Sequence, residues 1–469
     1  ISGGLVGSEM CIRDSQDTNS VQYRLLKHLV RDHRNLCVVG DDDQSIYGWR
    51  GAEPGNLFQF EKDFPDVKVV RLEQNYRSTE VILKAANALI ENNSQRMPKT
   101  LWSEKPGGEL LGWIEAEDEV LETETVVRRI RLDIMRHNRK LEEYCILYRS
   151  NFQSRVLEES LREAKLPYRV VGGKSFFERK EIRDALAYLK LIQNPNDLVS
   201  LQRVINTPRR GIGKTSLMQL NACVAETSLP VLKIMSQARK YSSIPAEAAS
   251  SMEVFSALLG DFQSRFEKGN LGEVFRELLD ELGYLRFLEQ QSGDVKSREK
   301  RIQVVQELLR GAQRYAEDHP ENQLGDYLER MMLFSENDDQ DGSTSQALTL
   351  MTLHSAKGLE FPYVYMVGMS EGLFPNPRAL DDDAEEEERR LCYVGITRAQ
   401  RELVFSMAKT RKRYQETLLQ EPSRFLMELD PKLFSTPVIG EASLEQKGKM
   451  KKRSRSDFFQ NLKQFNSQS

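Results

Sequence analysis

Two parts of the chain alternate short, nearly continuous apolar runs with stretches of helical periodicity. The runs are rich in aliphatic and aromatic residues, and they occur at 36–40, 67–72, 144–149, 347–353 and 363–368. Strands of a parallel sheet are buried on both faces, so they read as unbroken apolar runs beside helices. The pattern therefore predicts an α/β fold whose strands come from both parts of the chain.

The stretch between these parts, at about 176–345, has a different period. It reads as a series of amphipathic helices with few strand candidates, and it ends in the polar, turn-rich segment 337–345. The simplest interpretation is a helical domain inserted into an α/β domain. Beyond residue 433 the chain becomes polar, and 447–455 carries six cations. This composition predicts a disordered basic tail.

Composition narrows the possible classes of protein. A length of 469 residues predicts roughly three domains, and a net charge of −4 argues against a uniformly basic nucleic-acid binder. Binding to DNA would then require a localised basic groove. Five cysteines without a Cys-x-x-Cys pair are typical of a reduced, cytoplasmic compartment. The sequence also lacks an 18-residue apolar run and a secretory signal pattern, which predicts no membrane contact.

The segment 39–52 reads Val-Gly-Asp-Asp-Asp-Gln-Ser-Ile-Tyr-Gly-Trp-Arg-Gly-Ala and follows an expected strand. This places Gln44 where the carboxyl edge of a parallel sheet meets ligands. Tyr47 and Trp49 offer rings on which bases of any sequence can stack, at about 1–3 kcal/mol per base. The alternatives are a solvated turn for Asp41 to Asp43 and a core-packing role for Trp49.

Three further segments carry ordered patterns. They read Leu-Glu-Gln-Asn-Tyr-Arg-Ser at 72–78, Thr-Leu-His-Ser-Ala-Lys-Gly-Leu-Glu at 352–360, and Glu-Glu-Glu-Glu-Arg-Arg-Leu-Cys-Tyr-Val-Gly-Ile-Thr-Arg-Ala at 385–399. Together with 39–52, they resemble motifs III to VI of the superfamily 1 DNA helicases. The resemblance covers about 16–433. It is similar to the Rep, UvrD and PcrA group of 3′-to-5′ translocases, and to Rep first.

The resemblance implies RecA-like motor domains of the P-loop type, called 1A and 2A, with a helical 2B insertion in 2A. The implied division is part of 1A at 16–71, 2A at 72–175 and 346–433, 2B at 176–345, and the tail at 434–469. Residues 1–15 lack the expected apolar strand and are interpreted as a non-native stretch.

ATP is the nucleotide that the resemblance implies. Gln44 would sense the γ-phosphate and the attacking water, Tyr76 would stack on adenine, and Glu360 would meet the ribose. Arg77 and Arg398 would reach the γ-phosphate, where a planar guanidinium stabilises the spread charge of phosphoryl transfer. Taken alone, either arginine is more typical of an ordinary surface residue.

The same resemblance implies contacts with single-stranded DNA. Tyr47 and Trp49 would stack on bases, and Arg50 would couple this contact to the nucleotide. Thr352, His354 and Ser355 would hold the strand phosphates, although an isolated histidine is more often structural.

The segment 203–214 resembles a helix-hairpin-helix turn. Its amides and cations could bind duplex phosphates through Arg209, Gly211, Gly213 and Lys214, with Arg210 beside them. A helix C-cap with solvated cations is an equal alternative. Gly211 to Thr215 imitates the end of a phosphate loop, but Pro208 stands where the first glycine belongs.

The complete phosphate loop of the family has no counterpart in the sequence. Gln16 to Asn19 resembles the end of the Walker B segment, which places Arg13 and Asp14 at its two acidic positions. A guanidinium has no lone pair for Mg²⁺, so the metal ligands of an ATP–Mg²⁺ site are expected to be missing. The acidic run 381–388 is interpreted as a solvated loop and helix start, and no metal site is predicted.

The predicted function is that of an ATP-dependent 3′-to-5′ DNA helicase in replication or repair, acting on single strands and single/double-strand junctions. A replication or repair protein could bind the basic tail. The chain by itself is expected to be inactive, and the alternative is a non-catalytic module that binds single-stranded DNA or a partner.

Overall fold

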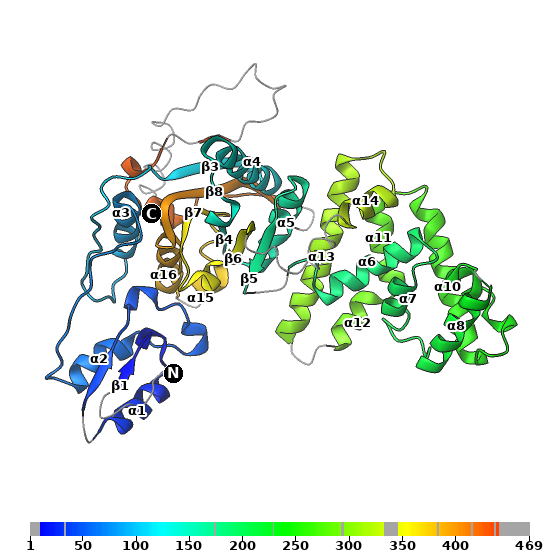
Figure 1. The fold of residues 1–469 in the computed structure, drawn as a ribbon, viewed down its shortest axis with the longest axis horizontal. Coiled ribbons are helices and arrows are strands. Elements are labelled where there is room, and N and C mark those ends of the chain that lie inside the picture. The colour runs from blue at the N-terminus through cyan, green and yellow to red at the C-terminus, as the bar shows by residue number, and fades with distance from the viewer. Residues whose placement is uncertain are drawn as a thin grey trace, which may run out of the picture. The chain divides into compact units, whose positions relative to one another are not determined.

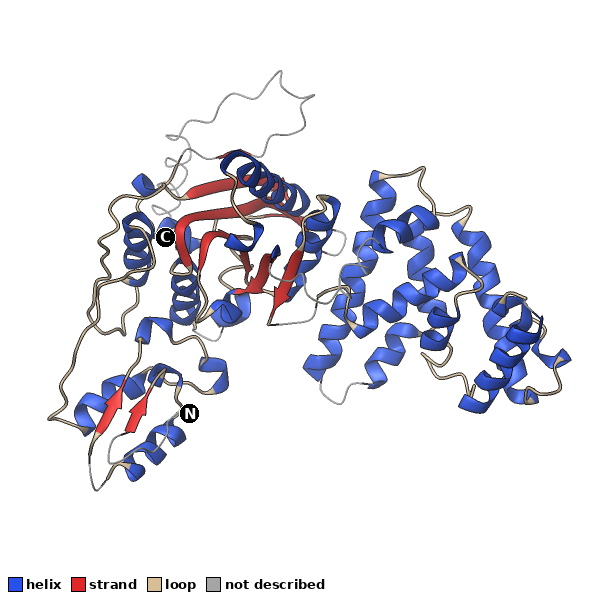
Figure 2. Ribbon diagram, viewed as in Figure 1, coloured by secondary structure: helices blue, strands red, loops and turns tan. Residues whose placement is uncertain are grey.

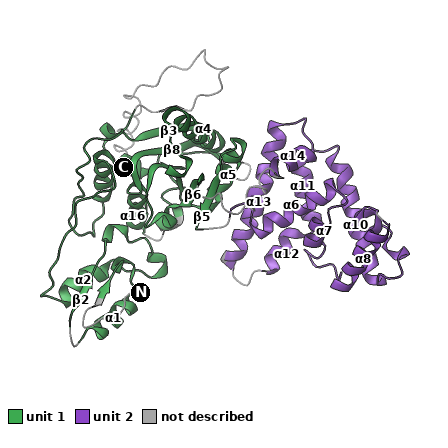
Figure 3. Cartoon of the chain, viewed as in Figure 1, with its two compact units in different colours: residues 1–173, 343–469 green, residues 174–342 purple. Residues whose placement is uncertain are grey.

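The computed structural model describes residues 10–31, 34–172, 175–227, 229–291, 295–332, 346–381, 384–413, 416–435 and 438–439. The chain divides into two units (Figure 3). Unit 1 comprises Ile1–Gly173 and Ser343–Ser469, and unit 2 comprises Lys174–Gly342. The sequence predicts the helical insertion at 176–345, within three residues of this division.

A mixed sheet of eight strands, counted over the described residues, forms the centre of unit 1 (Figures 1 and 2). Its order is β10-β3-β8-β7-β4-β6-β5, and β9 pairs with β8. The β8–β9 pair is antiparallel and the other pairs are parallel. The strands are β3 (Gly112–Asp118), β4 (Tyr144–Tyr148), β5 (Tyr168–Val171), β6 (Leu348–Thr352), β7 (Phe361–Met366), β8 (Ala399–Arg413), β9 (Glu416–Leu419) and β10 (Val438–Ile439). This confirms the predicted α/β class.

Helices cover both faces of this sheet because its central strands alternate between two cores. In β4, Cys145 and Leu147 pack with helices α3 (Glu80–Ile90) and α16 (Glu385–Ile396). Tyr144, Ile146 and Tyr148 face the other way and pack with α4 (Glu119–His137) and α5 (Ser154–Glu163). Every residue of β4 is buried, as its unbroken apolar run predicts. The short helices α15 (Pro377–Asp381) and α17 (Arg424–Met427) complete the described helices of this part.

The segment 353–360 runs over one face of the sheet, from the carboxyl ends of the strands to their amino ends. It leaves the carboxyl end of β6 and enters the amino end of β7, and both strands pair in parallel with β4 between them. A connection between parallel strands must return along the length of the sheet. Leu353 and Ala356 are buried in the core beneath it.

A smaller two-stranded sheet lies nearer the N-terminus. Strand β1 (Met10–Ile12) pairs in parallel with β2 (Leu36–Val38), beside α1 (Ser20–Leu29) and α2 (Gly55–Asp63). The expectation that no strand precedes residue 16 is therefore wrong. The reason is that three residues suffice for β1 when β2 offers a neighbour.

The expected strand at 67–72 is absent from the structure. Val69, Val70 and Leu72 in this segment are exposed, and Leu72 is 81% exposed. A strand is stable only when a neighbour satisfies its backbone groups, and none of the described strands pairs with this segment. The prediction failed because an apolar run reports strand propensity and not the presence of a partner.

Unit 2 is helical throughout its described residues and has its own core. The α-helices are α6 (Lys180–Gln193), α7 (Leu198–Val204), α8 (Lys214–Thr227), α9 (Val231–Met235), α10 (Ala246–Phe266), α11 (Leu271–Glu281), α12 (Tyr284–Gln291), α13 (Val295–Asp318) and α14 (Leu324–Met332). Phe262, Phe275 and Tyr284 are fully buried in this core. No described helix of the chain is long and apolar enough to cross a membrane.

The acidic run ending at Glu388 begins a helix, as the sequence predicts, but Glu388 itself is buried and not solvated. Its last four residues form the first turn of α16, where carboxylates favour the positive end of the helix. Glu388 is buried and binds the Arg149 guanidinium in a fork, with nitrogen–oxygen distances of 2.6 to 3.1 Å. It also accepts the amide of Asn376 at 2.9 Å. Residues 382–383 of the run lie outside the described residues.

This pair generates a stability prediction. Glu388→Gln should lower the free energy of unfolding of unit 1 by about 3 kcal/mol, because it leaves the buried guanidinium without its counter-charge. The chain's three tryptophans, Trp49, Trp102 and Trp113, all lie in unit 1, so urea unfolding followed by tryptophan fluorescence reports this unit. Glu385→Gln, at a half-exposed ion pair in the same turn, is the control and should cost less than about 1 kcal/mol. Equal losses in the two variants would contradict the prediction.

Candidate functional site

Arg77 and Glu360 meet at the amino ends of β7 and β8. The Arg77 Nε lies 2.5 Å from a Glu360 carboxylate oxygen, and its NH1 donates to the Thr397 carbonyl at 3.1 Å. The neighbouring Ser78 hydroxyl donates to the Ala399 carbonyl at 2.6 Å, which anchors the segment to β8. The Arg77 hydrogen bond lowers the pKa of Glu360, so this carboxylate is charged at neutral pH. The predicted residues Arg77 and Glu360 are thus brought together.

Arg398 lies nearby but is folded inward, and its side chain is only 2% exposed. Its guanidinium donates to the carbonyls of Val394 and Leu359 and to the Thr397 hydroxyl, at 2.9 to 3.1 Å. Burial, together with the nearby Arg77 charge, lowers the pKa of Arg398 to about 10. In this conformation Arg398 is a packing residue, and reaching a phosphate would require it to leave these acceptors.

Tyr76 presents an open aromatic face beside Arg77. Its side chain is 73% exposed, and its hydroxyl donates to the Gln74 side chain at 2.8 Å. A tyrosine held at its hydroxyl and exposed at its ring is suited to stacking on a planar base.

Gln44 lies in a turn formed by two short helices, Asp42–Gln44 and Gly48–Arg50. Helix α16 holds the turn at two points: the Arg390 Nε donates to the Ser45 carbonyl at 3.0 Å, and Glu387 accepts the Gly48 amide at 3.1 Å. A side chain at Gly48 would collide with that Glu387 carboxylate. A side chain at position 48 would therefore displace the Glu387 carboxylate from the Gly48 amide.

Lys357 holds the same turn, although no individual role is predicted for it from the sequence. Its ammonium lies 2.5 Å from the Asp17 carboxylate, 2.8 Å from the Gln44 carbonyl and 5.1 Å from the centre of the Tyr47 ring. It therefore joins the segment that crosses the sheet to the turn that carries Gln44. Its place inside the motif at 352–360 was the available signal.

The aromatic residues of the turn differ in exposure. Trp49 is 65% exposed, so the core-packing alternative for it is wrong. The Arg50 guanidinium lies 4.5 Å from the Trp49 ring and 5.6 Å from the Tyr47 ring. Tyr47 is half-buried against the core of unit 1, between Arg50 and Lys357. Trp49 is therefore the ring with a free face for stacking.

The carboxyl end of β6 carries Thr352, His354 and Ser355. Arg77 lies at the other end of the sheet, where β7 and β8 begin. The Thr352 and Ser355 hydroxyls are 2.9 Å apart, and the Ser355 amide donates to the Thr352 hydroxyl at 3.3 Å. Burial and the nearby Arg149 charge lower the pKa of His354 to about 4. At neutral pH His354 is therefore an uncharged hydrogen-bonding group and not a cation.

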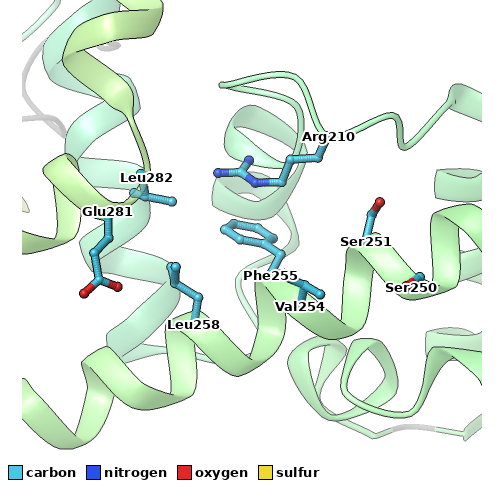
Figure 4. Close-up of a pocket in the computed structure, with 8 residues that line it drawn as sticks. All are labelled: Arg210, Ser250, Ser251, Val254, Phe255, Leu258, Glu281 and Leu282. Carbon is cyan, nitrogen blue, oxygen red and sulfur yellow. The ribbon is translucent and has the colours of Figure 1, made fainter.

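The predicted hairpin lies in unit 2, between α7 and α8. Gly211 has a φ of 72°, which favours glycine, and the structure leaves open space around Gly211 and Gly213. Arg209 and Lys214 are exposed. Arg210 instead turns inward: its guanidinium lies 4.0 Å from the Phe255 ring centre and donates to the Val204 carbonyl at 2.8 Å (Figure 4). Arg210 thus shapes the hairpin, and it lines an adjoining pocket together with Val254, Phe255 and Leu258.

Neither the expected Walker B positions nor the carboxylates of Asp41 to Asp43 form a suitable site for a divalent cation. Arg13 occupies one expected ligand position, and a guanidinium cannot coordinate a metal. The carboxylates of Asp41, Asp42 and Asp43 lie close enough together to hold an ion, but the Lys99 ammonium contacts all three. These residues therefore do not fit Mg²⁺.

The sheet is parallel in its centre, carries two arginines at the amino ends of its strands and has polar residues at the carboxyl end of β6. This is the arrangement of a RecA-like helicase motor. Comparison with protein families agrees: the UvrD-like helicase C-terminal domain matches residues 70–410, and the UvrD/REP helicase N-terminal domain matches residues 9–65. The chain belongs to the UvrD-like helicase family. The second match begins inside the stretch 1–15 that was expected to be non-native.

Curated relatives give the same assignment. The chain is 41% identical to the ATP-dependent DNA helicase PcrA of Bacillus subtilis strain 168 over 425 residues, covering 89% of this chain and 57% of the relative. It is also 41% identical to PcrA of Staphylococcus aureus strain Mu50 over 435 residues, which cover 92% of this chain and 59% of that relative. The chain thus spans less than two thirds of these relatives. They are PcrA proteins, and they do not support the prediction that the chain resembles Rep first.

The environment of His354 generates a titration prediction. Its pKa of about 4 lies below the ordinary value of about 6.5, so the unfolded chain takes up this proton first as the pH falls. The His354 contribution to stability should be complete above pH 6.5 and lost between about pH 6.5 and 4. An imidazole NMR titration should give a midpoint near 4 for the signal that disappears in His354→Gln. A midpoint at 6.5 or above would contradict this environment.

Proposed function

We propose that unit 1 contributes part of the motor of an ATP-dependent DNA helicase that moves along single strands in the 3′-to-5′ direction. The observation that carries the proposal is the path of segment 353–360. One end lies at the edge that presents Thr352 and His354, and the other ends at Glu360 beside Arg77. Lys357, midway, contacts the Gln44 carbonyl. A shift at the nucleotide end can therefore be transmitted to the strand-binding end.

At the nucleotide edge, adenine would stack on Tyr76 and the ribose hydroxyls would donate to Glu360. The ribose would then compete with Arg77 for Glu360, which frees that guanidinium to turn toward the γ-phosphate. Arg398 would join it by leaving its carbonyl acceptors. Loss of such an arginine typically lowers phosphoryl-transfer rates by about 10³–10⁵-fold.

At the other edge, DNA would be held without regard to sequence. Trp49 would stack on a base, with Arg50 beside it linking this contact to the turn of Gln44. Thr352, Ser355 and neutral His354 would donate hydrogen bonds to strand phosphates. In unit 2, the exposed hairpin with Arg209, Gly211, Gly213 and Lys214 would bind duplex phosphates at a single/double-strand junction.

The phosphate loop and the Mg²⁺-holding carboxylates have no counterpart in the sequence. We therefore expect the chain by itself to bind DNA and not to hydrolyse ATP. This observation also favours the second candidate, a non-catalytic module that binds single-stranded DNA or a partner. All five cysteines are free thiols, which supports a cytoplasmic protein of replication or repair. The basic tail proposed as a partner contact lies outside the described residues.

Hydrolysis of ATP with and without single-stranded DNA tests the proposal. The chain would be compared with the same chain joined to the coding sequence that precedes it in frame at its source locus. DNA-stimulated hydrolysis in the joined form alone is the expected result. Hydrolysis by the chain alone would contradict the account of the phosphate loop. DNA binding without hydrolysis in either form would favour the binding module.

The exposed ring of Trp49 predicts a loss of strand affinity. Trp49→Ala should weaken binding of a single-stranded oligonucleotide about 5- to 150-fold, the equivalent of about 1–3 kcal/mol for one stacked base. Fluorescence anisotropy of a labelled oligonucleotide measures this effect. Trp102→Ala is a matched control, since Trp102 is half exposed and outside the turn. An unchanged affinity in Trp49→Ala would exclude the stacking contact.

A further inference from the structure

Three consecutive carboxylates, Asp41 to Asp43, gather around the ammonium of Lys99. The Lys99 Nζ lies 3.0 Å from Asp41, 2.5 Å from Asp42 and 2.8 Å from Asp43. Asp42 is 3% exposed and Asp43 is 1% exposed. Buried carboxylates are stable only when paired, so this cation is required by the turn.

Lys99 comes from the connection between α3 and β3, far from the turn in sequence. The same connection places the Arg96 guanidinium on Asp43, at 2.9 and 3.3 Å, and the Met97 amide on Asp42 at 2.7 Å. Asp42 and Asp43 therefore have partners besides Lys99. Among the described residues, Lys99 is the only cation that forms an ion pair with Asp41.

Asp41 in turn orients the Gln44 side chain. Its second carboxylate oxygen accepts the Gln44 Nε2 at 2.6 Å. An ionised carboxylate can only accept hydrogen bonds, so the amide nitrogen must face Asp41 and the amide oxygen must point away. No described donor contacts that oxygen. An oxygen presented in this way can accept a hydrogen bond from a water molecule and orient it for attack on a phosphate.

We propose that Lys99 is a positioning residue, which holds the Asp41 carboxylate in place and thereby presents the Gln44 amide oxygen to the attacking water. The inference deepens the proposed function and rests on it. Without the ammonium, the three neighbouring carboxylates would repel one another, and Asp41 would lose the cation that fixes its side chain. Asp41 would then no longer hold the Gln44 amide nitrogen, and the amide oxygen would lose its fixed direction.

The electrostatics support a permanently charged Lys99. Burial by itself lowers the pKa of the Lys99 ammonium, but attraction to Asp41, Asp43 and Asp42 outweighs it and raises the pKa above its usual value. Lys99 is therefore charged at neutral pH.

Hydrogen–deuterium exchange of the chain as it stands tests the physical link. Lys99→Met should speed the exchange of amides in 43–50 at least tenfold and leave peptides from β4 and β7 unchanged. Lys84→Met is the control, because Lys84 is an exposed residue of α3 that pairs with Glu80, and it should change neither region. No change in 43–50, or faster exchange throughout unit 1, would overturn the proposal.

Steady-state kinetics in a form of the protein that hydrolyses ATP test whether Lys99 acts on catalysis through Gln44. Lys99→Met should lower kcat at least tenfold at an unchanged KM for ATP, and Lys99→Arg should recover part of the loss. In a Gln44→Ala background, Lys99→Met should lower kcat less than twofold further. A full additional loss would overturn the proposal, since Lys99 would then act independently of Gln44. If no form hydrolyses ATP, the proposed function fails, while the exchange experiment still decides whether Lys99 holds the turn.

Discussion

The parallel pairing of β4 with both β6 and β7 is the constraint on which the rest of the larger unit depends. Because the strands run in one direction, the eight residues between β6 and β7 must cross the sheet from one edge to the other. They carry polar side chains towards both ends, and Leu353 and Ala356 are buried in the core beneath them. In the proposed function, the two ends of this one short segment would therefore contact different ligands.

Charged side chains then attach more distant parts of the chain to this frame. A carboxylate that leaves water must find a cation, and in three places in unit 1 that cation comes from far along the sequence. Lys99 pairs with Asp41 to Asp43, Lys357 with Asp17, and Arg149 with Glu388. Each pair joins segments that are distant in sequence, and Lys357 also links the segment 353–360 to the turn that carries Gln44.

Much of the fold could be predicted because unbroken apolar runs mark buried parallel strands, as at β4 and β7. The run at 67–72 was misread because strand propensity does not reveal whether a neighbour is present. The order of the motifs along the chain pointed to the candidate residues, but it could not predict which side chains surround each of them. Arg398 is folded onto carbonyl oxygens, and Glu388 is buried on Arg149. Charge and spacing look the same in sequence whether a side chain is solvated or paired.

The sequence by itself determined the class of fold, the helical insertion, the helicase family and the residues of its motifs. These depend on local periodicity and on patterns confined to short segments. Only the tertiary structure decided that Trp49 is exposed while Tyr47 is half-buried, that His354 is neutral, and that Lys99 and Lys357 hold the turn of Gln44. Such properties depend on burial and on contacts between residues more than 50 positions apart, which no local pattern records.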